Sequence, residues 1–197
     1  MPNWCSSAYC IHGPKKPVED AKKFIEKALS DAANKEASNP ESWLGQIVIA
    51  CGMDYGKVSC RGWIQDITEI EDMRIGLEEI SYFYIYSEDA WGPMPEVFLL
   101  LIEKKFPGQN LELCFTAEEP GCGVYCNTDT SGIFFQDRWV VEDYESFHEY
   151  FETDEEVIDF INREFELSCK TIADVIEFAN SANGLALNLC VNEFSPS

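Results

Sequence analysis

Residues 80–126 read ISYFYIYSEDAWGPMPEVFLLLIEKKFPGQNLELCFTAEEPGCGVYC and form the densest apolar segment of this 197-residue chain. Residues 80–86 are aromatic or β-branched at nearly every position, which predicts a strand covered on both faces. After a turn rich in proline, residues 95–105 predict a helix that is apolar nearly all round at its centre. The alternation over 111–117 and the returning segment 122–126 predict two more strands.

The chain before this segment opens with a strand and a helix. Residues 3–12 alternate weakly up to a Gly-Pro pair, and Pro17 suits a first helical position. Apolar residues then recur at three- and four-residue spacing over 18–32, which predicts an amphipathic helix with its lysines outward.

Three further segments lead up to residue 80. The spacing within 44–51 favours a short helix, although its β-branched residues favour a strand more weakly. Residues 58–70 predict a strand with a bulge at Gly62. Residues 71–79 predict an acidic connection.

Beyond residue 126 the composition shifts towards acids. Residues 133–141 suggest one more strand, and Thr153 with Glu156 forms a capping box before an amphipathic helix. A second helix is predicted from about residue 172 to near Asn183-Gly184. The clean alternation of residues 185–191 predicts a final strand.

The predicted element order is that of a ferredoxin-like sandwich. We therefore expect an α+β fold, with a ferredoxin-like antiparallel sheet, helices packed on it, extra strands and C-terminal helices. We expect this domain to span residues 1–142. Residues 143–197 are expected to form an acidic helical extension with a final strand, packed on the same domain.

The chain carries 36 acidic residues against 14 lysines and arginines, a formal net charge of −22. Residues 1–35 hold six lysines against four acids, whereas residues 142–166 hold eleven acids against one arginine. Such a field repels a phosphate backbone, which argues against direct nucleic-acid binding. It suits solubility, the simpler interpretation, or a basic protein partner that normally binds nucleic acid.

The sequence has no signal-like opening, and its longest apolar run, residues 97–102, is far too short to span a bilayer. We therefore expect a cytoplasmic protein with no membrane contact. Because the cysteines are odd in number and the chain is not small, we expect reduced, mostly buried thiols. They are Cys5, Cys10, Cys51, Cys60, Cys114, Cys122, Cys126, Cys169 and Cys190.

Several short motifs occur in a fixed order along residues 1–142. They are Met1-Pro2-Asn3-Trp4-Cys5, Trp43-Leu44-Gly45, Cys60-Arg61-Gly62, Asp89-Ala90-Trp91, Lys105-Phe106-Pro107, Ala117-Glu118-Glu119-Pro120-Gly121 and Phe135-Gln136-Asp137-Arg138. Together they resemble the YubB-type ferredoxin-like family of phages, plasmids and bacterial mobile elements. The resemblance implies a ferredoxin-like topology, not an iron–sulfur protein. It implies no established activity, and so it assigns no catalytic residue.

The cysteine and histidine spacing gives little support to cofactor chemistry. Cys122 and Cys126 are separated by three residues and no Cys-x-x-Cys occurs, so no iron–sulfur cluster is expected. Cys10 and His12 would share a face of the first strand, but a structural zinc site needs four ligands, so packing is favoured. His12 and His148 lack a catalytic signature. No calcium loop, P-loop or dinucleotide motif is present, and we expect no cofactor.

Asp89, Trp91, Glu118 and Glu119 form the candidate binding corner. If the two strands that carry them flank one helix, the four residues lie at one end of the sheet. Paired carboxylates there could perform acid–base chemistry. In the structural alternative, the following Pro-Gly makes the turn, the acids solvate it and Trp91 caps the core.

Two classes of function remain open. The first is a non-enzymatic, mobile-element-associated protein-binding module, whose acidic last third acts as a decoy for a basic, nucleic-acid-binding partner. The second is a small hydrolase-like or metal-assisted enzyme at the carboxylate corner. A concave site beside Trp91 would favour the second.

Overall fold

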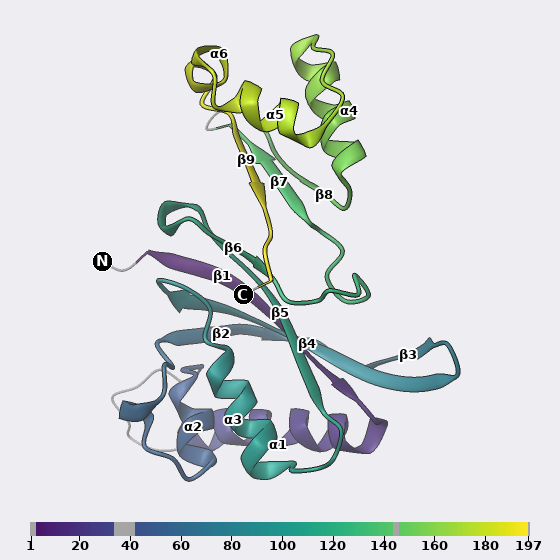
Figure 1. Cartoon of the computed structure of the whole chain (residues 1–197). Helices are drawn as coiled ribbons and strands as arrows, with labels where there is room; N and C mark the ends of the chain where they lie inside the picture. Colours follow the sequence, from purple (N-terminus) through teal and green to yellow (C-terminus); the bar gives the residue numbers. More distant parts are fainter. Residues whose placement is uncertain (1–2, 34–41, 144–145, 197) are drawn as a thin grey trace. The chain divides into compact units, whose positions relative to one another are not determined.

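The protein is a mixed α/β fold with antiparallel sheets (Figure 1), seen in a computed structural model that describes residues 3–33, 42–143 and 146–196. The chain forms two compact units, Met1–Val124 and Tyr125–Ser197. The sequence predicts this division further along, after residue 142. Within the described ranges, no helix has both the length and the apolar character to cross a membrane.

The first unit is built on a sheet with the strand order β2-β4-β1-β5, in which all neighbours are antiparallel. β1 (Trp4–Gly13) and β4 (Glu78–Ala90) are its long central strands, flanked by β2 (Gly62–Ile67) and β5 (Glu112–Glu119). β3 (Glu71–Ile75) forms a hairpin with the first part of β4. β6 (Val124–Asn127) begins at the last residue of the unit.

Three helices cover one face of this sheet, α1 (Lys15–Ala33), α2 (Gly45–Ala50) and α3 (Pro95–Lys105) (Figure 1). Two short 3-10 helices, η1 (Tyr55–Lys57) and η2 (Pro120–Cys122), lie in the connections. The central strands contribute large side chains that are 0% exposed, and the Tyr9 ring lies 4.6 Å from that of Phe98 on α3. Each such side chain contributes about 1.5–3 kcal/mol through its burial. Among them are Tyr9 and Ile11 of β1 and Phe83 and Ile85 of β4, and Phe98 and Leu101 of α3 are equally buried.

The helix predicted over 95–105 is confirmed as α3, and the first strand and helix are confirmed as β1 and α1. The connection predicted over 71–79 is wrong. Gly76, at φ 61°, allows a tight turn, so β3 pairs back onto an extended β4. The bulge of β2 lies between Ile64 and Asp66 rather than at Gly62.

The sequence predicts that β4 is covered on both faces. Only one of its faces is fully buried. Phe83 and Ile85 are 0% exposed towards the helices, whereas Tyr82 and Tyr84 are half-buried and Tyr86 is 42% exposed. A tyrosine ring tolerates this intermediate position because its hydroxyl remains polar. The continuous aromatic run in the sequence therefore does not reveal that one face of the strand is buried and the other is partly exposed.

The second unit has a smaller antiparallel sheet with the order β8-β7-β9. Its apolar core includes Val141, Val157, Ile161 and Val175, all 0% exposed. The strands are β7 (Trp139–Glu142), β8 (His148–Phe151) and β9 (Cys190–Glu193), and the helices are α4 (Asp154–Phe165), α5 (Ile172–Ala179) and α6 (Ala182–Ala186).

The capping box of Thr153 and Glu156 is confirmed at the start of α4, and a second capping box opens α5. The strand predicted over 185–191 is wrong up to Leu189, because α6 and the turn after it precede β9. There Ser181 accepts a hydrogen bond from the N–H of Gly184 at 3.3 Å and caps α6. The strand begins only at β9, and β8 was not predicted.

Gly62 lies where β2 meets the end of β4. A Cβ at this position would stand 2.1 Å from Asp89 Oδ1 and 3.0 Å from the backbone oxygen of Glu88. We expect Gly62→Ala to lower the free energy of unfolding by about 1–3 kcal/mol, because the added methyl group overpacks the site. Urea denaturation measures this change. Gly92→Ala is the matched control, since a Cβ there has no neighbour within 4 Å. Equal stability of the two variants would contradict the close approach of Gly62 to Asp89.

Candidate functional site

Asp89, the first residue of the predicted corner, is 0% exposed on the face of the sheet that the helices cover. Tyr9 Oη donates a hydrogen bond to Asp89 Oδ2 at 2.6 Å, and Ser87 Oγ donates to Oδ1 at 2.9 Å. The backbone N–H of Met94, which precedes α3, donates to Tyr9 Oη at 2.5 Å. Asp89 therefore ties both central strands to the start of α3.

Glu118, the second carboxylate of the corner, lies on the opposite face of the sheet from Asp89. Ser6 of β1 pairs with Glu118, whereas Cys5 pairs with Asp89. Successive residues of a strand point to opposite faces. The strands thus direct the two carboxylates away from one another, unlike the paired carboxylates of an acid–base site.

Trp91 and Glu119 lie in the turns after β4 and β5. Trp91 is 52% exposed, and its backbone has φ 75°, a conformation that is rare for a bulky residue. Its backbone N–H donates to the Asn3 carbonyl oxygen at 2.9 Å. Glu119 Oε1 accepts from the N–H of Gly121 at 3.0 Å and caps η2. The structure therefore brings all four residues to one end of the sheet, with Asp89 inside, Glu118 on the opposite face, and Trp91 and Glu119 in the turns.

Burial dominates the electrostatics of Asp89. It raises the pKa of Asp89 above the ordinary value of 3.8, although hydrogen bonds from Tyr9, Ser7 and Ser87 lower it. The same burial, with the neighbouring carboxylate, raises the pKa of Tyr9. Sequence reasoning missed Tyr9 and Ser7 as partners of this acid. The signal was present in the alternation over 3–12, which places both side chains on one face.

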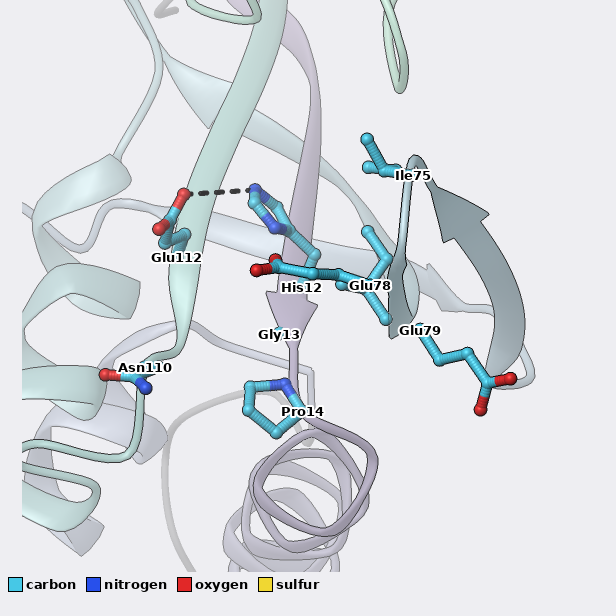
Figure 2. A pocket seen from close by; sticks show the side chains of 9 residues that line it. His12, Gly13, Pro14, Ile75, Glu78, Glu79, Asn110 and Glu112 are labelled. Carbon is cyan, nitrogen blue, oxygen red and sulfur yellow. Dashed lines mark ion pairs between the residues drawn. The ribbon is translucent and has the colours of Figure 1, made fainter.

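An open hollow of about 630 Å³ lies at the far end of β1 (Figure 2). His12 Nε2 lies 4.0 Å from Glu112 Oε2, while Glu79 points away from this pair. No serine, cysteine or lysine is among the lining residues, so the hollow offers no nucleophile for covalent catalysis. The lining consists of His12, Gly13, Pro14, Ile75, Glu78, Glu79, Ile80, Asn110 and Glu112.

The other end of this sheet, where β1 and β2 begin and β4 ends, is rich in tryptophan. The ring centroids of Trp4 and Trp63 lie 4.9 Å apart in a T-shaped arrangement. The backbone of Trp43 forms a bridge with Trp63, and its ring lies 5.2 Å from Tyr55. With Trp91, four of the five tryptophans of the chain lie here. We call this end of the sheet the tryptophan end. Exposed aromatic groups of this kind are typical of interaction sites.

The second unit has its own acidic hollow, of about 370 Å³, beside α4. The guanidinium of Arg163 lies 5.4 Å from the Phe160 ring centroid. On the neighbouring strands, His148 Nδ1 lies 2.8 Å from Glu142 Oε2. This pair provides two potential metal ligands, whereas a structural zinc site uses four. The hollow is lined by Asp137, Tyr150, Phe151, Glu152, Glu156, Asp159, Phe160 and Arg163.

All nine cysteines are free thiols and six of them are buried, so the prediction of mostly buried thiols is confirmed. Cys10 lies on β1 directly opposite Cys114 of β5 and shares its face with His12. Burial raises the pKa of the Cys51 and Cys60 thiols. A raised thiol pKa disfavours the reactive thiolate, so these two cysteines are packing residues.

Comparison with known proteins found no matching protein-family model, no matching curated protein and no matching solved structure. The resemblance to the YubB-type family therefore stays a prediction.

The raised pKa of Asp89 predicts a pH dependence of stability. Because the folded state holds this proton to higher pH than the unfolded state, the stability that it contributes is complete below pH 3.8. That contribution is lost as the pH rises through the raised pKa. In urea titrations across this range, the free energy of unfolding of the wild type minus that of Asp89→Asn should fall with rising pH. A difference that grows with pH would contradict burial as the dominant effect.

Proposed function

We propose that the protein is a non-enzymatic binding module that recognises a positively charged segment of a partner protein. The observation that carries this proposal is a face of the first sheet, opposite the helices, on which exposed aromatic rings and a carboxylate occur together. Trp4 is 39% exposed and Tyr86 42%, and Glu88 lies on β4 between Tyr86 and Ala90, the partner of Trp4. Aromatic side chains supply affinity in protein interfaces, and charges select the partner.

The charge distribution supports a basic partner. Residues 1–124 hold twenty acids against eleven bases, and residues 125–197 hold sixteen acids against three. A field of this sign accelerates association with a basic protein and opposes a nucleic acid. The acidic last third adds to this field, and a nucleic-acid-binding protein, the partner in the decoy interpretation, is one basic partner of this kind.

We also propose that the first unit has a ferredoxin-like topology. The strand order β2-β4-β1-β5, the antiparallel neighbours and the helices on one face support it. The motifs of residues 1–142 support membership of the YubB-type family of mobile elements, and with it a cytoplasmic location.

The enzyme alternative gains no support from the carboxylate corner. Asp89 is buried among its hydrogen-bond donors, Glu118 lies on the other face, and Glu119 caps a turn. Acid–base catalysis needs both groups within reach of one substrate.

The proposal predicts salt-dependent binding of a basic peptide. Fluorescence anisotropy with labelled nona-arginine should show binding at 50 mM salt that weakens at least tenfold at 500 mM, because salt screens the attraction. A labelled oligothymidine should not bind. A control protein of similar net charge but without exposed tryptophans should bind the peptide more weakly. No binding of nona-arginine at either salt concentration would refute the proposed function.

A further inference from the structure

We infer that Glu88, framed by Trp4, Trp63 and Tyr86, is a binding site for the guanidinium group of an arginine side chain from the partner protein. The inference rests on the proposed function and names its point of recognition. No residue of the site belongs to the predicted carboxylate corner.

The register of three strands assembles the site. On β4, Glu88 is directly opposite Ser6 of β1 on one side and Trp63 of β2 on the other. Side chains of directly opposed residues share a face of the sheet, with Cβ atoms about 4.5–5.5 Å apart. Tyr86, two residues earlier on β4, is on the same face. The ring of Trp63 in turn lies 4.9 Å from Trp4, at an interplanar angle of 67°.

The Glu88 carboxylate has an unusual environment for this acidic protein. It is half-buried, and its side chain makes no hydrogen bond or ion pair with any residue that the structure describes. Other acids of the same unit do have partners: Glu69 pairs with Lys22, Asp72 with Lys15, and Glu71 with the hydroxyl of Tyr82. A half-buried charge loses hydration unless a partner compensates it. Glu88 therefore offers a position for a cation from outside.

The aromatic frame favours arginine over other cations. A planar guanidinium stacks on indole and phenol rings and forms two parallel hydrogen bonds with one carboxylate. Lysine provides only a point charge that is more strongly hydrated. A nucleic acid could stack bases on the same rings, but its phosphates would face Glu88 and the acidic field of the chain. The chemistry of this face thus fits a basic peptide better than a nucleic acid.

Peptide titrations of single variants test the site. Labelled nona-arginine should bind the wild type several times more tightly than nona-lysine. Glu88→Gln keeps the size of the side chain and removes its charge, and it should weaken binding of nona-arginine about tenfold or more. Trp63→Leu should weaken it by a similar factor. Circular dichroism spectra check that both variants remain folded.

Two matched controls isolate the site from general charge and aromatic content. Glu112→Gln removes one carboxylate at the other end of the sheet, and Tyr150→Leu removes a ring of the second unit that is 46% exposed. Both should bind the peptide within about twofold of the wild type. If Glu88→Gln binds like these controls while the wild type binds well, the inference is overturned and the proposed function stands. If the wild type binds only oligothymidine, or neither probe, both are overturned.

Discussion

The buried hydrogen bond between Tyr9 and Asp89 is the interaction on which the first unit depends. It joins the two central strands, and through the N–H of Met94 it fixes the start of α3. A buried carboxylate is costly unless donors surround it, and a donor removed from such a group leaves the full desolvation penalty. The close approach of Gly62 completes this arrangement, since no larger residue would leave room for the carboxylate. At this end of the sheet, the buried acid thus connects β1, β4 and the start of α3.

The local elements of this protein could be read from its sequence, but its long-range pairings could not. Pro95 and the Pro-Gly after Phe106 define α3, and the capping box at Thr153 defines α4, because each signal lies within a few residues. The buried hydrogen bond of Asp89 could not be predicted, because its donor Tyr9 lies 80 residues away along the chain. The partly open face of β4 was missed for a similar reason, since an apolar run does not say how many layers cover it.

The register puts the predicted corner at one end of the first sheet but does not bring its carboxylates together. Trp91 does lie at the end of the sheet, yet the carboxylates predicted beside it are buried, on the other face or engaged in a turn. The acid that the structure offers instead is Glu88, one residue before Asp89 and on the opposite face of the same strand. Its relation to Trp63 and Trp4 depends on the register of three strands, which no local pattern reveals. The acidic composition, by contrast, was evident from the sequence alone, and it is one basis for proposing a basic partner.

The central claim is that the tryptophan end of the first sheet binds an arginine of a basic partner. The most direct measurement is the indole N–H region of a nitrogen-15 correlation spectrum, in which each of the five tryptophans gives one signal. Titration with unlabelled nona-arginine should shift the signals of Trp4 and Trp63. It should leave Trp139 of the second unit unchanged, since that residue is 5% exposed and its indole N–H donates to Asp154. Shifts confined to Trp139, or no shift of Trp4 and Trp63 at saturating peptide, would contradict the claim.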